Sequence, residues 1–141
     1  MEYRKRLSCL KCALMAVMIV FPMFQRVNAQ TAAGPEPFLV HLSDTTTNYQ
    51  EIFPGPPKTA SMHSGLVVLT PGTSVGRHST KKYEEAIVVL SGSGEFRVTG
   101  GPTLQLSPNS VAYCPPKREH DVVNTGTAPL RYIYIAAKHE K

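Results

Sequence analysis

The chain has 141 residues, of which 42% are hydrophobic, and its 15 Lys and Arg outnumber its 10 Asp and Glu to give a formal net charge of +5. Residues 1–29 hold five of these cations and one of the acids, so the other 112 residues have a net charge of only +1. A near-neutral chain of this length is large enough for one domain with a single core. It lacks the basic footprint of a nucleic-acid-binding protein, and we expect no such partner.

The first segment, residues 1–29, has the organisation of a secretory signal peptide. Three cations at residues 4–6 precede the apolar run Ala13–Phe24, and Ala29 closes the segment as a small residue before a cleavage site. The alternative is a membrane anchor, but this run has twelve residues, includes Pro22, and is shorter than the ~20 apolar residues that a span needs. We therefore expect cleavage near Ala29, no stable membrane anchor, and a secreted or periplasmic protein.

Beyond residue 29 the chain shows no extended helical periodicity. An edge strand is expected over Pro37–Leu42, followed by a loop, Ser43–Ala60, that is rich in turn residues. Residues 30–60 are thus interpreted as an N-terminal lead with an edge strand, and residues 61–141 as the main domain. In that domain, short β-rich runs such as "GLVVL", "EAIVVL" and "LRYIYIAA" are separated by Gly, Pro and Asn. Short strands with frequent turns predict an all-β sandwich or barrel.

One predicted strand has an unusual pattern. Ala86–Leu90 is apolar at every position, whereas a strand with one solvated face alternates apolar and polar residues. We expect this strand to be covered on both faces, by the barrel interior on one side and by a second sheet or a partner subunit on the other. A homodimer is the expected assembly.

Two histidines and a glutamate stand beside predicted strands. His78 precedes Glu85 by seven residues, and His120 follows a proline turn at the start of another strand. Taken singly, each residue type is ordinary at a protein surface. In a barrel, however, all three side chains could point into one apolar interior, where two imidazoles and a carboxylate are costly to bury without a partner. A divalent metal ion supplies that partner, so the three residues are predicted metal ligands.

The spacing of these residues resembles the first motif of the cupin superfamily. That motif reads Gly, five residues, His-x-His, three or four residues, Glu, six residues, Gly. The chain has Gly72, His78, Thr80, Glu85 and Gly92 at these places. The chain departs from the motif at Thr80, which stands where the family has its second histidine.

A second stretch resembles the second cupin motif, which reads Gly, five residues, Pro-x-Gly, two residues, His, three residues, Asn. Pro115, His120 and Asn124 fall in their places, whereas Asn109 and Lys117 replace the two glycines. Each motif alone is loose. Their occurrence in order, separated by 16 residues, makes the resemblance specific.

The resemblance covers about Met62–Ile135 and implies a small double-stranded β-helix, or jelly-roll barrel, with a metal ion inside. Carried over by position, the ligands are His78, Glu85 and His120, with Thr80 in the fourth-ligand position. Thr80 leaves two readings, a metal held by two histidines and one carboxylate or a site that has lost its metal, and the cost of burying unpartnered polar groups favours the first. That ligand set is typical of non-haem Fe(II) oxygenases, so iron is favoured, followed by manganese, nickel and zinc.

Three tyrosines are candidates for a catalytic role. Tyr83 and Tyr113 flank the two motifs, and Tyr132 shares a strand face with Leu130 and Tyr134. A tyrosine in the barrel could donate a hydrogen bond or act as a general acid or base. Packing is the commoner role for a buried tyrosine. Cys114 is expected to be a small buried hydrophobic residue.

Together these features predict a cupin that acts as a metal-dependent enzyme on a small oxygen-bearing organic molecule. Dioxygenase, lyase and isomerase chemistry all occur in the family that the chain resembles. The alternatives are a non-catalytic cupin that binds a sugar or a small acid, and a structural protein that dimerises through its apolar strand.

Overall fold

The computed structural model describes residues 34–138, which lie within one compact unit, Ala32–Lys141. The signal peptide expected over residues 1–29 lies outside the described residues. Within residues 34–138 every regular element is a β-strand, and no helix is long and apolar enough to cross a membrane. The prediction of an all-β domain is confirmed for the described residues.

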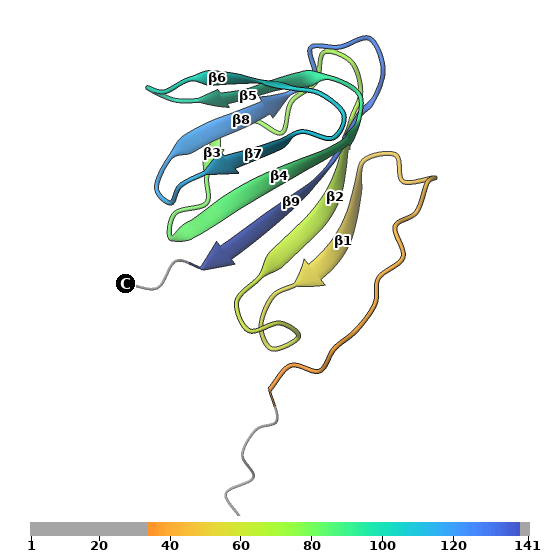
Figure 1. Ribbon diagram of the computed structural model, residues 1–141, viewed down its shortest axis with the longest axis vertical. Coiled ribbons are helices and arrows are strands. Elements are labelled where there is room, and N and C mark those ends of the chain that lie inside the picture. The colour runs from red at the N-terminus through yellow and green to blue at the C-terminus, as the bar shows by residue number, and fades with distance from the viewer. Residues whose placement is uncertain (1–33, 139–141) are drawn as a thin grey trace, which may run out of the picture. The chain divides into compact units, whose positions relative to one another are not determined.

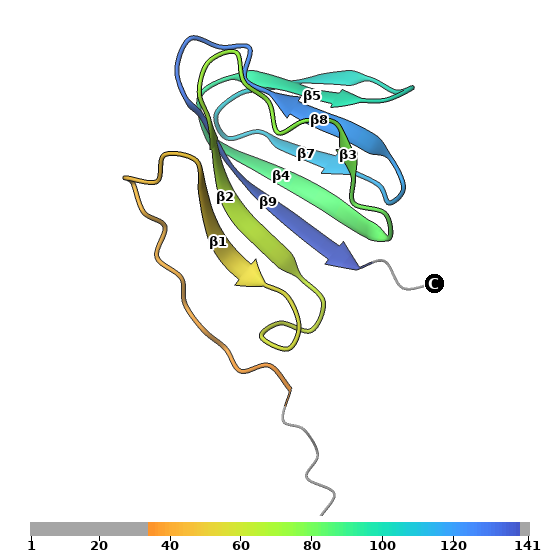
Figure 2. The same cartoon turned by 180° about the vertical axis from the view of Figure 1, so that it is seen from behind.

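The described residues form nine strands in two antiparallel sheets (Figure 1). One sheet has the order β1-β2-β9-β4-β7 and the other β3-β8-β5-β6. Figure 2 shows the short strand β3 beside β8. The strands are β1 Tyr49–Pro54, β2 His63–Leu69, β3 His78–Ser79, β4 Tyr83–Ser91, β5 Gly94–Val98, β6 Thr103–Leu106, β7 Val111–Cys114, β8 Glu119–Val123 and β9 Leu130–Lys138.

The core is built from the inward faces of both sheets. Residues of one face alternate along each strand, so every second side chain of β4, β5, β8 and β9 turns inward. These side chains pack into one hydrophobic cluster, which includes Ile87, Val89, Phe96, Val122, Leu130 and Tyr132. The cluster fills one part of the interior, and the polar candidate residues lie beside it.

The prediction of an edge strand over Pro37–Leu42 is wrong. This segment has no regular structure, and the edge strand is instead β1, inside the stretch expected to be a loop. Tyr, Ile and Phe in "YQEIFP" favour a strand, but turn residues lie on both sides of this short run, so the whole stretch was predicted to be a loop. The lead is held to the sheet by polar contacts, including a 2.9 Å hydrogen bond from Gln50 Nε2 to the His41 carbonyl.

Within one chain, no second sheet covers the outer face of Ala86–Leu90 in β4, so of the two covers expected for that face only a partner subunit is left as a prediction. Ile87 and Val89 point inward and are each 1% exposed, whereas Leu90 is 38% exposed on the opposite face. Ala86 and Val88 share that outer face and are half-buried. A second sheet packs only against the inner face, so any further cover for the outer face would come from another molecule.

Two residues that replace the motif glycines keep the backbone conformation typical of glycine. Asn109 has φ of 65° and Lys117 has φ of 66°. Asparagine tolerates this left-handed region through local hydrogen bonding, but lysine pays the steric cost of its Cβ atom. The turn before β8 therefore has the geometry that glycine would adopt there, at the expense of some stability.

The variant Lys117→Gly should be more stable than the parent by about 0.5–1 kcal/mol. The left-handed conformation costs a non-glycine residue about 1–2 kcal/mol, and glycine removes that cost. The greater conformational freedom of glycine in the unfolded chain offsets part of the gain. Denaturant unfolding measures the change. The control is Lys82→Gly, at an exposed turn position without a positive φ, which should be destabilising. Equal losses of stability in both variants would contradict the strain at Lys117.

Candidate metal centre

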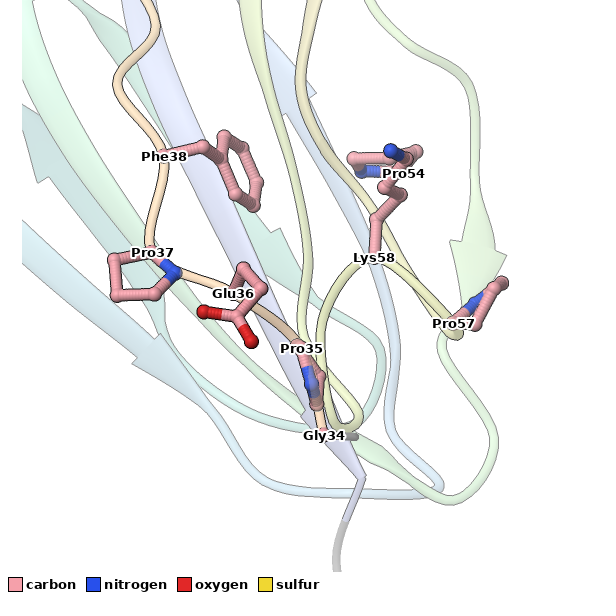
Figure 3. A pocket seen from close by; sticks show the side chains of 8 residues that line it. All are labelled: Gly34, Pro35, Glu36, Pro37, Phe38, Pro54, Pro57 and Lys58. Atoms are coloured by element: carbon pink, nitrogen blue, oxygen red, sulfur yellow. The ribbon is translucent and has the colours of Figure 1, made fainter. Parts of the chain in front are cut away.

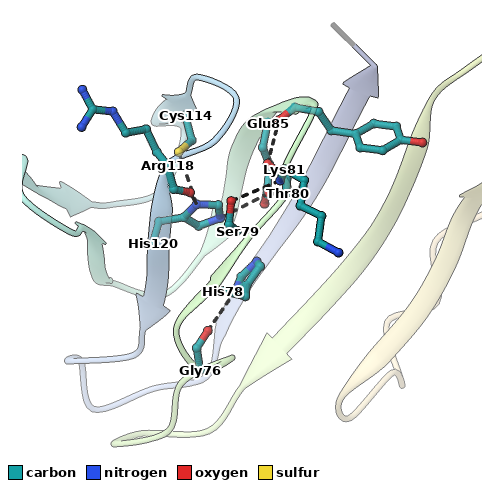
Figure 4. A network of polar contacts seen from close by, with 10 residues as sticks. Gly76, His78, Ser79, Thr80, Lys81, Glu85, Cys114, Arg118 and His120 are labelled. Carbon is teal, nitrogen blue, oxygen red and sulfur yellow. Dashed lines mark hydrogen bonds and ion pairs between the residues drawn. The ribbon is translucent and has the colours of Figure 1, made fainter.

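Three polar side chains from three different strands meet in the barrel, where Glu85 and His120 are buried and His78 is exposed (Figure 4). His78 starts β3, Glu85 is an inward-facing residue of β4, and His120 lies in β8. Strands β3 and β8 pair with His78 opposite His120, and their ring centroids are 4.5 Å apart. One ligand atom from each residue lies within 4.8 Å of the others, a grouping that could hold a metal ion.

The two ring nitrogens of His120 have different surroundings. Nδ1 lies 3.1 Å from the Arg118 carbonyl oxygen and 3.3 Å from Cys114 Sγ. A carbonyl only accepts, so Nδ1 carries the hydrogen in this contact. Nε2 is buried without a hydrogen-bond partner, 3.3 Å from Glu85 Oε2. In the neutral imidazole, Nε2 has a lone pair that faces the Glu85 carboxylate. A favourable contact between these two atoms therefore needs a cation or a proton between them.

His78 has the complementary arrangement at the open side of the group. Its Nδ1 lies 2.9 Å from the Gly76 carbonyl oxygen, which makes Nδ1 the donor and leaves Nε2 as a lone pair. A backbone carbonyl on the second ring nitrogen is the usual way in which proteins orient a metal-binding histidine. Both histidines of the group have such a partner, so the donor set fits a divalent metal ion.

The neighbours of His120 have opposing effects on its pKa. Burial lowers the pKa, whereas the contact with Glu85, the charge of Glu85, the Arg118 carbonyl and the charge of Asp121 raise it. The net result is a pKa above the usual value for histidine. Without metal, the contact with Glu85 therefore favours the protonated form of His120, and a bound metal ion would take the place of that proton.

The pH dependence of stability follows from this shift. For a pKa raised on folding, the stabilising contribution is present below the unfolded pKa of about 6.5 and is lost as the pH rises through the folded value. We therefore expect the Tm of the chelator-treated parent to fall from about pH 6 to about pH 8, relative to the His120→Gln variant. Thermal unfolding in a series of buffers measures it. A parent and variant with parallel profiles would contradict the ion pair.

Thr80, in the fourth-ligand position, lies beside the group, but its hydroxyl hydrogen is used in a hydrogen bond to a backbone carbonyl. Its hydroxyl donates a 2.7 Å hydrogen bond to the Tyr83 carbonyl. Its lone pairs remain free to accept a hydrogen bond from water or a ligand. The structure thus brings together the three residues of the expected ligand set, with a neutral acceptor where the family has a second histidine.

A cavity of about 400 Å³ opens over the group. This volume is within the range of small-molecule sites. The lining residues are Val67, Val75, His78, Thr80, Glu85, Val122, Tyr132, Tyr134 and Ala136. No lysine or arginine is among them, so the lining offers no side-chain cation to pair with an anionic ligand.

The three candidate tyrosines lie in different places. Tyr132 lines the cavity. Tyr113 is 56% exposed on the outer face of β7 and donates a 3.0 Å hydrogen bond to Glu84. Tyr83 packs its ring against His63, with centroids 5.4 Å apart, and does not line the cavity. Tyr132 is therefore the one of the three that a molecule in the cavity would meet.

The contact between Cys114 and His120 could not be anticipated from the sequence. Cys114 is fully buried, as expected, but it also lies opposite Glu85 in the pairing of β4 with β7. That register, together with the turn that returns the chain into β8, places the thiol against the His120 ring. Five residues lie between Cys114 and His120, and this spacing predicts no contact until the conformation of the turn between them is known.

A larger cavity of about 570 Å³ lies away from this group (Figure 3). It is bounded by the lead, Gly34–Phe38, and by residues at and beyond the end of β1. Among its lining residues only Glu36 and Lys58 are charged, and most of the others are prolines. It contains no set of metal-binding side chains, so the candidate site is the smaller cavity.

Comparison with known proteins agrees with the fold and the motifs. The sequence profile of the cupin domain matches residues 65–136, half of the chain, and the chain belongs to this family. No curated protein sequence matches it.

Solved structures of cupins are similar at low identity. A cupin 2 conserved barrel domain protein from Salinispora arenicola is 21% identical, with 73% of this chain and 91% of that chain covered and a TM-score of 0.60. A protein from Bacillus halodurans is 18% identical, with coverages of 77% and 86% and a TM-score of 0.64. The Cnp3 cupin domain of Schizosaccharomyces pombe is 21% identical, with a TM-score of 0.58, and the match spans only 64% of each chain. These likenesses confirm the jelly-roll barrel.

Proposed function

We propose that this cupin binds a divalent metal ion through His78, Glu85 and His120. The observation that carries the proposal is the buried Nε2 of His120, which faces Glu85 without a hydrogen-bond partner. Two histidines and one carboxylate leave open coordination positions and are typical of non-haem Fe(II) sites. Iron is therefore the favoured metal, with manganese, nickel and zinc as the alternatives.

We further propose that the protein is a metal-dependent enzyme of dioxygenase, lyase or isomerase type. When bound, the metal supplies Lewis-acid polarisation of a substrate oxygen, and iron also supplies access to O₂ chemistry. The chain's own contribution is to hold a small oxygen-bearing molecule in the 400 Å³ cavity. Val67, Val75, Val122 and Ala136 would contact its apolar part and limit the access of water.

The alternative is a non-catalytic cupin that binds a sugar or a small acid. Thr80 favours this alternative, since it removes one family ligand and leaves an acceptor in its place. The apolar lining argues against a sugar, because a buried sugar needs many polar partners for its hydroxyl groups. Turnover by the metal-loaded protein distinguishes the two functions. Elemental analysis of protein purified without chelator, followed by oxygen-uptake and product assays with small oxygenated compounds, is the direct test.

We also propose that the chain acts as a homodimer outside the cytoplasm. Leu90, Val111 and Tyr113 form an exposed apolar group on the outer face of β4 and β7, and a second copy of this face is the expected cover. Sedimentation of the purified protein tests the dimer. Export after cleavage near Ala29 is tested by the amino-terminal sequence of protein recovered from the periplasm or the medium.

A further inference from the structure

Tyr132 has a buried side chain with an unpartnered hydroxyl group. The residue is 2% exposed and lies on the inner face of β9, where it lines the cavity together with His78 and Glu85. Among the described residues its hydroxyl has no hydrogen-bond partner. Among the described residues, the fully buried side-chain atoms without a partner are His120 Nε2 and Asp121 Oδ1, so the Tyr132 hydroxyl is open to the cavity, where a bound molecule can supply its partner.

The neighbouring tyrosine on the same strand face shows the contrast. Tyr134 also lines the cavity, but its hydroxyl lies 3.2 Å from the hydroxyl of Tyr49 on β1. Residues two apart on a strand point to the same side, which explains why both rings face the cavity. Of these two phenols, Tyr132 is the one whose hydroxyl has no partner among the described residues.

The surroundings of Tyr132 keep it protonated. Burial is the largest cause of a raised pKa, and the charges of Glu85 and Asp121 act in the same direction. A neutral phenol at physiological pH donates a hydrogen bond and does not act as a base. This state suits an acceptor oxygen on the ligand.

The charge of the site limits the ligand further. A divalent ion held by two neutral histidines and one carboxylate leaves a single positive charge. The lining has no lysine or arginine to add to it, and most of its remaining surface is apolar. A second negative charge on a ligand would therefore be buried without a partner, which is costly.

Resting on the metal site proposed above, we infer that the Tyr132 hydroxyl donates a hydrogen bond to an oxygen of the molecule bound at the metal, and that this molecule is a small, largely apolar oxygen compound with one negative charge. Tyr132 is then a specificity-determining residue. It selects oxygen compounds that present an acceptor beside the coordination position.

Two properties of Tyr132→Phe distinguish this role from packing. The phenylalanine ring has the same shape, and removal of a hydroxyl that opens to the cavity costs no hydrogen bond within the protein, so the Tm should be close to that of the parent. Ligand binding should nevertheless weaken. A residue that only packs would show neither the loss of binding nor its dependence on the hydroxyl.

The experiment uses zinc-loaded protein and 4-nitrocatechol, whose absorption changes when it coordinates a metal. Elemental analysis is made on the same samples. For Tyr132→Phe we expect unchanged zinc content and a Kd raised by about tenfold or more, the effect of losing a hydrogen bond to a charged oxygen. The control is Tyr113→Phe, whose hydroxyl lies on the outer face, and its Kd should equal that of the parent.

The outcomes separate this inference from the metal site. Full zinc content with an unchanged Kd in Tyr132→Phe would overturn the role of Tyr132 and leave the metal site standing. A parent that binds neither zinc nor the probe would overturn both. The inference that the ligand has only one negative charge is tested with 3,4-dihydroxybenzoate, which has an additional carboxylate. It should bind at least about tenfold more weakly than catechol, and equal affinities would overturn this part of the inference.

Discussion

Replacement of His120 by alanine is expected to remove the metal from the protein. His120 offers a buried, pre-oriented nitrogen, and without it only one imidazole and one carboxylate remain. Loss of an interaction that merely orients a ligand costs about 10–100-fold in metal affinity, so loss of a ligand should cost at least about 100-fold. Elemental analysis of protein purified without chelator should find near-stoichiometric metal in the parent and almost none in the variant.

The same loss is expected for Glu85→Ala and His78→Ala, each checked for folding by circular dichroism. His41→Ala is the matched control, because His41 lies in the lead and outside the group. Unchanged metal content in all three ligand variants would refute the ligand set. Loss of metal from the control would place the binding site elsewhere.

The variant Gly92→Ala should lower the free energy of unfolding by about 3 kcal/mol or more, the upper part of the range for overpacking. Gly92 ends the first motif and has φ of 81°. A Cβ atom there would lie 2.3 Å from the Pro129 carbonyl oxygen and 2.7 Å from Leu130 Cα. Both are backbone atoms at the start of β9, which cannot shift without disturbing the sheet. Denaturant unfolding measures the loss.

Gly100→Ala separates the two causes of that loss. Gly100 also has a positive φ, 66°, but a Cβ atom there would meet nothing within 4 Å. Backbone strain alone costs about 1–2 kcal/mol, and the lower entropy of alanine in the unfolded chain returns part of it, so the net loss should be about 1 kcal/mol or less. Equal losses in the two variants would show that the close approach at Gly92 has no energetic effect.

The sequence predicted the parts of the fold that depend on local pattern. Short β-rich runs with frequent turns indicated an all-β barrel, and the motif spacings indicated which residues should converge. It failed at β1, where six strand residues lie among turn residues, because the pairing of β1 with β2 outweighs weak local preference. The sequence left open whether a second sheet or a partner subunit covers the outer face of Ala86–Leu90, because an apolar run does not show what lies against a strand.

For the candidate site, residue types and spacings were enough to select His78, Glu85 and His120, because polar groups that share a barrel interior need a common partner. The roles of individual atoms came only from tertiary structure. Strand pairing set which nitrogen of His120 faces Glu85, and strand alternation placed Tyr132 inside and Tyr113 outside. Such contacts join residues far apart in the chain, so no local pattern encodes them. The sequence determined the chemistry available to this protein, and the fold decided which atoms meet.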